Sequence, residues 1–179
     1  MPLAIRQAKA DDAMNLAALA IQVWLHTYAT TGIRKALAEY VLSEYTQAHF
    51  LERTADPAHL LLVAEADNHL VGYADLAFAS PCATAPALRT ELATLYIQEH
   101  FTGRGIGGRF LEACASEARR RCGDPGFWLS VYHLNARAIA FYRKHGFEAH
   151  GSFFFDFGGE RHENFILIPT SDSSLENSI

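Results

Sequence analysis

The sequence has few cysteines and no long apolar run, and each shortage excludes a class of protein. Its three cysteines, Cys82, Cys114 and Cys122, are odd in number and unpatterned, which indicates free thiols in a reducing compartment. The nine histidines form no H-E-x-x-H pattern and no Cys/His spacing typical of zinc, so no metal is expected. No apolar stretch could span a bilayer, and none follows the first charges as in a signal peptide. These shortages favour a cytoplasmic protein without a membrane partner.

Positive charge is also in short supply. Fifteen Lys and Arg face 20 Asp and Glu, a formal net charge of −5, which disfavours a nucleic-acid partner and mildly favours small cations. The 179 residues, 50% hydrophobic and 20% charged, suit one soluble domain with a real core. We expect a single domain over residues 1–169. The serine- and acid-rich tail over 170–179 is expected to be disordered.

Glycine, by contrast, is concentrated in one stretch, residues 91–121. An apolar run at 92–97 favours a strand, and four glycines then fall within six positions: Gly103, Gly105, Gly107 and Gly108. From Ile106 the apolar residues recur at helical spacing, and Arg119–Arg121 suit the negative end of a helix dipole. The pattern predicts a strand, a glycine-rich turn and a long helix.

This turn is a candidate anion site. Without a Cβ, glycine can adopt positive φ and let backbone N–H groups converge at a helix N-terminus, where a phosphate or diphosphate binds. The P-loop pattern fails, because Arg109 and Phe110 follow Gly108 instead of Lys and Ser or Thr. The dinucleotide pattern G-x-G-x-x-G fits only in its first half, at Gly103 and Gly105. A glycine-rich connection without any ligand is the alternative.

The remaining elements follow from periodicity and turn residues. Further strands are predicted at residues 3–8, 60–66, 70–79, 127–131, 147–157 and 161–168. A first helix, capped by Asp11 or Asp12 and running to about Tyr28, has the apolar positions Met14, Leu16, Leu19, Ala20, Val23 and Trp24. Further helices are predicted from Ser43 to Arg53 and from Asn135 to Gly146. Hairpin turns are predicted at Asp67–Asn68 and Gly158–Gly159.

Two motifs together resemble a known family. The run from Leu92 to Leu111, followed by Asn135-x-x-Ala138-x-x-Phe141-Tyr142-x-x-x-Gly146-Phe147, is similar to the GNAT superfamily of N-acetyltransferases. The resemblance covers residues 3–168. It implies an α/β (α+β) fold with a mixed, mostly antiparallel sheet of about seven strands, whose fourth and fifth strands splay apart, and about four helices. Phe127–Leu129 and Phe153–Phe157 look closest to the bacterial branch that acetylates spermidine and spermine (PaiA-like).

The resemblance implies acetyl-CoA as cofactor. Its pantetheine arm would bind the backbone of Leu95, Tyr96 and Ile97 like an added strand, and its diphosphate would lie on the loop Thr102, Gly103, Arg104, Gly105, Ile106, Gly107 and Gly108. Thr102 departs from the family pattern, which has Gln or Arg there and thus a longer donor. Asn135 would cap its helix and contact the cofactor. Arg137, Ala138 and Lys144 on the same helix would approach the cofactor's phosphates or adenine.

Acetyl transfer to an amine needs a base and an acid. An alkylammonium, with a reference pKa of about 10.4, must lose a proton before it attacks, and the departing thiolate is better protonated. The resemblance implies Tyr142 as the acid, with packing of an aromatic in the core as the alternative. Glu91 is the implied base, directly or through water, and its alternative is a solvated charge at a strand start. The backbone N–H near Ile97 would polarise the acetyl carbonyl.

The acceptor site would lie across the sheet, between the first helices and the final hairpin. The candidates are Trp24, Tyr28, Glu91, His133 and Phe154, with His26, Glu39, Asp156 and Glu160 as further lining. For each, ordinary core or surface packing is the alternative. Ala93 and Thr94 replace the acidic pair of animal diamine acetyltransferases, which argues against a polyamine acceptor. The phenylalanines at 153, 155 and 157 can bury against a second chain, so a homodimer is considered.

The leading hypothesis is an enzyme that moves acetyl from acetyl-CoA to a primary amine by direct attack. The acceptor is left open between a polyamine, another metabolite, an antibiotic and a protein amine. One alternative is a non-catalytic acyl-CoA sensor, which would bind the cofactor tightly and tolerate Tyr142→Phe. Another is a nucleotide-binding domain, which would bind ATP or NAD in place of coenzyme A.

Overall fold

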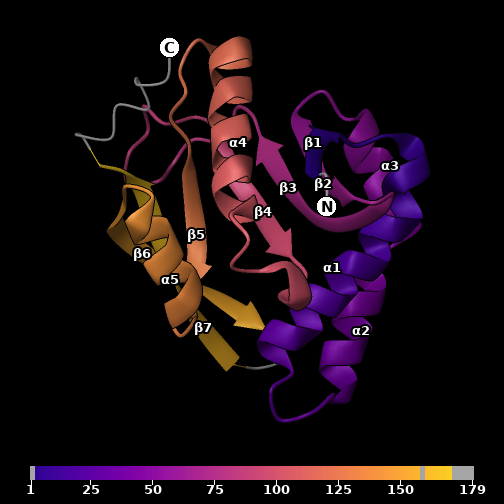
Figure 1. Ribbon diagram of the computed structural model, residues 1–179. Coiled ribbons are helices and arrows are strands. Elements are labelled where there is room, and N and C mark those ends of the chain that lie inside the picture. The colour runs from indigo at the N-terminus through magenta and orange to yellow at the C-terminus, as the bar shows by residue number, and fades with distance from the viewer. Residues whose placement is uncertain (1–2, 158–159, 171–179) are drawn as a thin grey trace. The chain divides into compact units, whose positions relative to one another are not determined.

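The computed structural model describes residues 3–157 and 160–170, which form seven strands and five α-helices (Figure 1). The strands are β1 (Leu3–Gln7), β2 (His59–Ala66), β3 (His69–Ala77), β4 (Glu91–Ile97), β5 (Trp128–Tyr132), β6 (Phe147–Phe157) and β7 (Glu160–Pro169). The helices are α1 (Ala13–Tyr28), α2 (Lys35–Glu44), α3 (Gln47–Ala55), α4 (Ile106–Cys122) and α5 (Ala136–Lys144). Two short 3₁₀ turns, η1 (Ala10–Asp12) and η2 (Glu99–Phe101), precede α1 and follow β4.

The chain divides into two compact units. The first comprises Met1–Leu76 with Thr94–Leu111, and the second comprises Ala77–Ala93 with Glu112–Ile179. Strands β3 and β4 and helix α4 contribute to both units, because the boundaries fall inside these elements. The strands follow the order β1-β2-β3-β4-β5-β7-β6. Among the described residues this is a mixed sheet of seven strands, as predicted.

The first unit gathers helices α1, α2 and α3 beside strands β1 to β3 (Figure 1). Its core joins α1 to the strands through Leu16 and Leu19, which pack with Val63 of β2, Tyr73 of β3 and Phe50 of α3. This face of α1 is the predicted one, with one exception. Met14 was predicted to be buried but is 62% exposed, because the buried face of α1 begins at Ala13 and Leu16.

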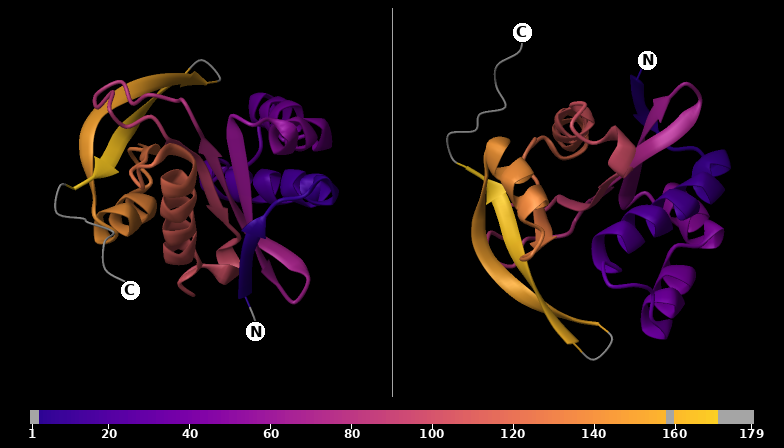
Figure 2. Two further views of the ribbon diagram at one scale, coloured as in Figure 1. Left: turned by 90° about the horizontal axis from the view of Figure 1, so that it is seen from above. Right: turned by 60° about the horizontal axis from the view of Figure 1, so that its bottom comes forward.

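The second unit is built on the long hairpin of β6 and β7, with helix α5 beside it (Figure 2). Strand β7 also pairs with β5, which pairs in parallel with the first residues of β4 at Glu91↔Trp128 and Leu92↔Leu129. The predicted splay of β4 from β5 beyond these pairs stays a prediction. The Gly158–Gly159 turn and the tail 171–179 lie outside the described residues, and β7 ends at Pro169.

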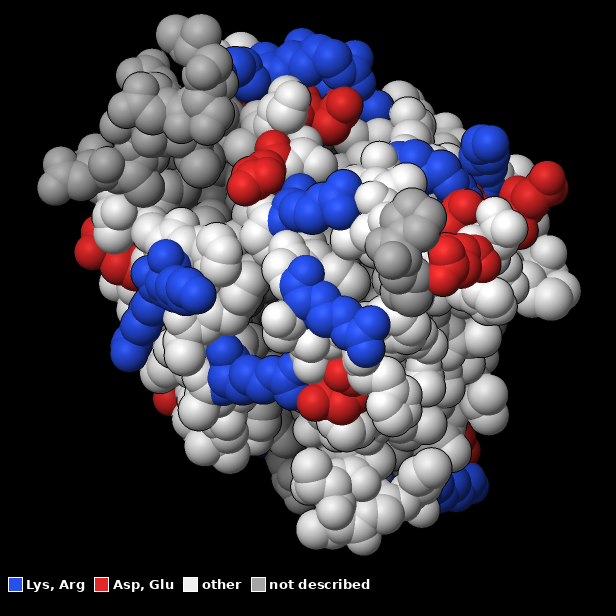
Figure 3. Space-filling model, viewed as in Figure 1, with Lys and Arg blue, Asp and Glu red and all other residues white. Residues whose placement is uncertain are grey.

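Two turns follow directly from local chemistry. Asp67 and Asn68 have φ of 49° and 63°, and a two-residue hairpin turn with positive φ at both positions matches the right-handed twist of the strands it joins. Gly123, with φ of 76°, ends helix α4, and its N–H donates to Arg119 O at 2.9 Å. Arg119–Arg121 lie in the last turn of α4, as predicted. Figure 3 shows basic side chains gathered at the upper edge, where Figure 1 places the end of α4.

The helix predicted from Ser43 to Arg53 is wrong, and this accounts for five helices instead of about four. Ser43 lies inside α2, where its hydroxyl donates to Tyr40 O at 3.0 Å. The true N-cap is Thr46, whose Oγ1 accepts from the His49 N–H at 3.1 Å and starts α3. Both residues are good caps, and only Thr46 adopts the extended backbone that a cap requires.

Asp12 is the N-cap residue of α1, as predicted, but it does not cap the helix with its side chain. Asp12 precedes α1 but makes no side-chain cap bond to it, because its carboxylate accepts from the Lys9 N–H at 2.7 Å and from the Arg6 guanidinium at 2.7 and 2.9 Å. These contacts lower the pKa of Asp12, chiefly through the Arg6 hydrogen bond. None of the helices formed by the described residues combines the length and apolarity needed to cross a bilayer.

Candidate active site

The glycine-rich loop between β4 and α4 has the backbone of an anion cradle. Gly103 and Gly105 have φ of 73° and 78°, and a Cβ built on either meets no atom within 4 Å. Helix α4 begins at Ile106, and the Arg109 N–H donates to Gly105 O at 3.2 Å. The N–H groups of Ile106, Gly107 and Gly108 belong to the first turn of α4, where no intrahelical acceptor exists. Positive φ and open space therefore present several N–H groups to one volume, which fits a diphosphate.

The polar and charged side chains around this loop are engaged with other groups of the protein. The Thr102 hydroxyl donates to Glu99 O at 2.8 Å, so its proton is engaged within the loop. Arg104 lies over the Phe101 ring, with its Cζ 5.1 Å from the ring centroid, and Arg109 donates to Leu3 O of β1 at 3.0 Å. The backbone N–H groups are thus the candidate donors to an anion at this loop.

The second half of β4, at Leu95, Tyr96 and Ile97, bonds to β3 along one edge. The Gln98 N–H donates to Val71 O at 2.9 Å, and a Cβ on Gly72 would lie 2.7 Å from Tyr96 O, so only glycine permits this approach. Backbone polar groups of a strand point to its two edges. The groups on the edge away from β3 are those that the family resemblance assigns to the pantetheine arm.

Tyr96 belongs to an aromatic cluster in the first unit. Its phenol lies 3.3 Å from that of Tyr45, and its ring meets Tyr73 edge-on at 5.5 Å between centroids. Burial raises the pKa of all three phenols, so they stay protonated at neutral pH. Of the acceptor-site candidates in this unit, Trp24 is buried against Tyr28 at 4.7 Å, and Tyr28 is 38% exposed. The ring of Tyr28 is therefore partly exposed, and the buried ring of Trp24 packs against it.

Two further acceptor candidates of the first unit lie beside charged side chains at the surface. His26 Nε2 lies 3.6 Å from Glu99 Oε2, and Glu39 lies 3.5 Å from Lys35 on the exposed face of α2. Pairs of this kind between exposed side chains contribute little to stability. The roles of His26 and Glu39 in lining the acceptor site stay predictions.

Glu91 in the second unit is fixed by a hydrogen bond. Ser80 Oγ donates to Glu91 Oε2 at 2.7 Å, and the Trp128 Nε1–H donates to Ser80 O at 2.8 Å. Trp128 is also the residue opposite Glu91 in the parallel ladder. Glu91 is half-buried, so one carboxylate oxygen is occupied by Ser80 and the other is available to a proton. The carboxylate is therefore an oriented group and not a solvated charge at a strand end.

Tyr142 lies on the buried face of α5, with 8% of its surface exposed. Its ring centroid is 5.1 Å from that of Phe141 and 5.9 Å from that of Phe147, which in turn packs 5.4 Å from Phe127. These aromatic contacts fix the ring. Packing and a proton-donor role are compatible, because the phenol oxygen is at the far end of a fixed ring.

Helix α5 begins where the sequence predicted. Asn135 is its N-cap, and Asn135 Oδ1 accepts from the Ala138 N–H at 3.1 Å. Arg137 and Lys144 are exposed on the same helix, and Ala138 is half-buried. The capping role of Asn135 is confirmed, and the cofactor contacts of these four residues stay predictions.

His133 and Phe154 are the acceptor candidates of the second unit. The N–H of His133 and its Nδ1 both lie 3.0 Å from Glu163 O, so the residue ties the β5–α5 loop to β7. Phe154 is 53% exposed, and Arg161 Cζ lies 4.2 Å from its ring centroid. The exposed Asp156 lies 3.8 Å from Arg161. The Glu160 side chain lies outside the described part of the chain.

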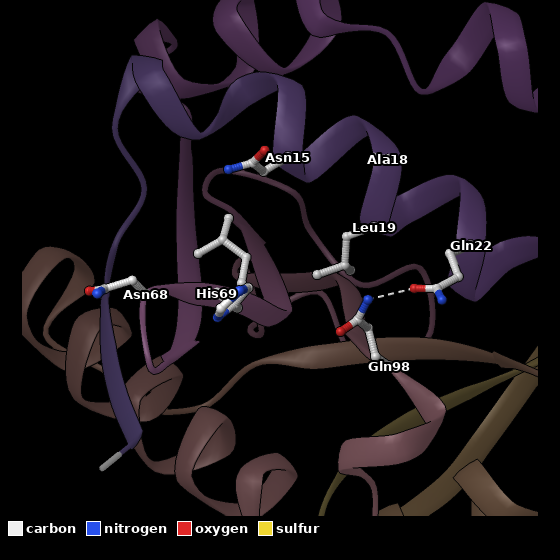
Figure 4. Close-up of a pocket in the computed structure, with 8 residues that line it drawn as sticks. Asn15, Ala18, Leu19, Gln22, Asn68, His69 and Gln98 are labelled. Atoms are coloured by element: carbon white, nitrogen blue, oxygen red, sulfur yellow. Dashed lines mark hydrogen bonds between the residues drawn. The ribbon is translucent and has the colours of Figure 1, made fainter. Parts of the chain in front are cut away.

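A separate hollow of about 530 Å³ occurs in the first unit, beside α1 (Figure 4). It is lined by Asn15, Ala18, Leu19, Gln22, Asn68, His69, Leu70 and Gln98. Gln98 Nε2 donates to Gln22 Oε1 at 2.6 Å across it. It contains none of the predicted site residues, so it is distinct from the candidate active site.

The predicted site residues thus fall into two groups, each within one unit. The loop residues, Leu95–Ile97, Trp24 and Tyr28 belong to the first unit, whereas Glu91, His133, Asn135–Ala138, Tyr142, Lys144 and Phe154 belong to the second. Sequence reasoning missed Ser80 and Tyr45, the hydrogen-bond partners of Glu91 and Tyr96. Neither falls in a motif, and no pattern in the sequence marks either of them.

Comparison with known proteins gives the class. The chain matches the acetyltransferase (GNAT) family over residues 22–147, more than half of its length, and it belongs to that family. It is 27% identical over 157 residues to an uncharacterized N-acetyltransferase of Mycobacterium tuberculosis, covering 88% of this chain and 96% of that one. It is 30% identical to the spermine/spermidine N(1)-acetyltransferase of Bacillus subtilis over only 73 residues, 41% of this chain and 47% of that protein.

Solved structures share the fold. PaiA N-acetyltransferase of Thermoplasma acidophilum, in complex with coenzyme A, has a TM-score of 0.75 at 24% identity, covering 95% of this chain and 99% of that one. YncA of Salmonella typhimurium, with its cofactor acetyl-CoA, has a TM-score of 0.65 at 20% identity, covering 99% of each chain. The expected GNAT fold is therefore confirmed. The protein is an acetyltransferase of this family, and acetyl-CoA is the donor that the family implies.

Proposed function

We propose that this enzyme transfers the acetyl group of acetyl-CoA to a primary amine of a small molecule by direct attack, without an acyl-enzyme. Bound acetyl-CoA supplies a thioester carbonyl that an amine can attack, which yields an N-acetyl product and the free thiol. The observation that carries the proposal is the oriented carboxylate of Glu91, held at 2.7 Å by Ser80 at the start of β4. A fixed carboxylate with one available oxygen is what general-base catalysis requires.

The chain's own groups then have separate roles. The N–H groups of the loop from Gly103 to Gly108 hold the diphosphate, and the free edge of Leu95–Ile97 holds the pantetheine arm. Glu91 Oε1 takes a proton from the attacking ammonium, directly or through one water. Tyr142 Oη gives a proton to the departing sulfur, because a neutral thiol is a better leaving group than a thiolate.

The acceptor is proposed to be a small cationic amine, a polyamine or another metabolite. Support comes from the net charge of −5 and from the partial similarity to a spermine/spermidine acetyltransferase. Tyr28, with Trp24 beneath it, offers a ring face that can attract an ammonium group. His133 and Phe154 are likewise proposed as acceptor contacts.

A panel of amines tests the proposal. Acetyl-CoA is incubated with spermine, spermidine, amino acids, an aminoglycoside and a peptide with a free N-terminus, and thiol release is followed with and without protein. We expect turnover with at least one small amine and much slower turnover by Glu91→Gln. Normal coenzyme A binding with no turnover on any amine would overturn the proposed activity, and turnover on the peptide alone would change the acceptor class.

A homodimer through β6 is proposed as the assembly. Among the described strands β6 ends the order, so one of its edges has no partner strand, and Phe153, Phe154 and Phe155 are 41–53% exposed on it. Two copies paired antiparallel about a two-fold axis at Phe154 would place Phe153 opposite Phe155, which is self-complementary. Light scattering should give a dimer for the natural chain and a monomer for Phe153→Asp. A monomeric natural chain at high micromolar concentration would refute the dimer.

A further inference from the structure

The segment between β3 and β4, residues 78–90, folds back on itself in the second unit. The Ser80 N–H donates to Arg89 O at 2.8 Å, and the Cys82 N–H donates to Leu88 O at 2.9 Å. Cys82 is buried, with 1% of its surface exposed, and anchors the segment. Ser80 is therefore held in place by backbone pairing and by a buried neighbour.

The residue before Ser80 is strained. Ala79 has φ of 58°, a left-handed conformation that costs a non-glycine residue about 1–2 kcal/mol. Such strain persists only where the surrounding structure over-determines it, and it often occurs beside functional groups. Ala79 directly precedes Ser80, the residue that contacts Glu91.

All three polar groups of Ser80 have partners within the second unit. Its N–H donates to Arg89 O, its carbonyl accepts from Trp128 Nε1 at 2.8 Å, and its hydroxyl donates to Glu91 Oε2 at 2.7 Å. The last contact has the length of a charge-assisted hydrogen bond between a hydroxyl and a carboxylate. Trp128 lies opposite Glu91 in the ladder, so the residue that binds the carboxylate, Ser80, is itself held by a side chain of β5.

We infer that Ser80 is a positioning residue that fixes the Glu91 carboxylate and directs its free oxygen, Oε1, to the acceptor amine. The inference rests on the proposed role of Glu91 as base. The Ser80 proton uses one lone pair of Oε2, whereas Oε1 has no hydrogen bond to another described residue, so the contact with Ser80 holds the side chain in one orientation for proton transfer at Oε1. A misplacement of about 1 Å can reduce turnover about a hundredfold, so the bond has a kinetic consequence.

A double-mutant comparison tests the inference. Ser80→Ala should lower kcat by about ten- to a hundredfold, while the KM for acetyl-CoA changes by less than about twofold. Ser80→Thr, which keeps the hydroxyl, should recover most of the rate. In the Glu91→Gln background, Ser80→Ala should cause no further loss, because its effect acts through the carboxylate. Thr84→Ala is the matched control, since Thr84 lies in the same loop and contacts Cys82.

The outcomes separate the inference from the proposed function. If Glu91→Gln turns over slowly but Ser80→Ala keeps the natural rate, the positioning role alone is overturned. The same holds if Ser80→Ala lowers kcat by the same factor in the Glu91→Gln background as in the natural chain. If Glu91→Gln turns over at the natural rate, the proposed role of Glu91 as the base is refuted. A readout independent of turnover is NMR relaxation of the Glu91 side chain. Natural protein should show one rigid rotamer and Ser80→Ala an averaged one, and an equally rigid Glu91 in both would refute the inference.

Discussion

Gly105→Ala tests whether the loop before α4 binds the diphosphate through its backbone. The φ of Gly105 is 78°, and a Cβ there meets no heavy atom within 4 Å, so the substitution causes no clash. Its whole effect on folding is the cost of a left-handed alanine, about 1–2 kcal/mol. For a chain of this size that lowers the melting temperature by roughly 2–8 °C.

Gly123→Ala is a closely matched control. Gly123 has φ of 76° and equally open space around its Cβ, so the strain in folding should be the same. It lies at the opposite end of helix α4, away from the N–H groups of the first turn. The two variants should therefore lose similar stability, and only one of them alters the loop.

The binding effect of Gly105→Ala follows from relaxation of that strain. As residue 105 moves toward negative φ, the next N–H group turns away from the bound anion. Loss of one hydrogen bond to a charged group is worth about 1.5–3 kcal/mol, or roughly a ten- to hundredfold rise in Kd. Calorimetry with coenzyme A should show this rise for Gly105→Ala and none for Gly123→Ala. Pantetheine, which lacks the diphosphate, should bind both equally. Unchanged coenzyme A affinity in Gly105→Ala would refute the reasoning.

Three further substitutions give separate readouts. Tyr142→Phe should lower kcat by about a hundredfold or more without raising the KM for acetyl-CoA, since a proton donor acts in the transition state; initial rates at the natural level would contradict this role. Asp12→Ala should lower the free energy of unfolding by about 2–4 kcal/mol, measured by chemical denaturation, whereas Asp11→Ala, at an exposed position, should leave it almost unchanged. Because Arg6 lowers the pKa of Asp12, this stabilisation is present above the ordinary carboxyl range and is lost as pH falls through the lowered pKa, so the two curves should converge in acid. Asn135→Ala should lower the free energy of unfolding by about 1 kcal/mol through loss of the α5 cap, whereas Asn135→Asp should keep the natural stability. Equal melting temperatures for these two variants would contradict the capping role.

The parts of the fold that local chemistry decides were predictable. The hairpin at Asp67–Asn68, the end of α4 at Gly123 and the cap at Asn135 each depend on a residue whose side chain or φ preference specifies one geometry. The split between α2 and α3 was not predictable in this way. Ser43 and Thr46 are equally good caps, and only packing of the surrounding helices selects between them.

The candidate site was predictable as far as its motifs extend. The glycine loop and Tyr142 belong to recurring patterns, but the partners that fix the site come from elsewhere in the chain. Tyr45 meets Tyr96 across 51 positions, and Ser80 meets Glu91 only because the intervening loop folds back. Hydrogen bonds of this kind depend on tertiary structure and leave no periodic signal in the sequence.

The most direct test follows the acetyl group itself. Acetyl-CoA with an isotopic label in the acetyl group is mixed with the best amine of the panel, and the product and intact protein are both measured by mass spectrometry. The account predicts labelled acetyl on the amine nitrogen, no label on the protein at any time, and a rate that falls at least about a hundredfold in Glu91→Gln. Label accumulating on the protein before the amine, or equal rates for Glu91→Gln and the natural chain, would contradict direct transfer assisted by Glu91.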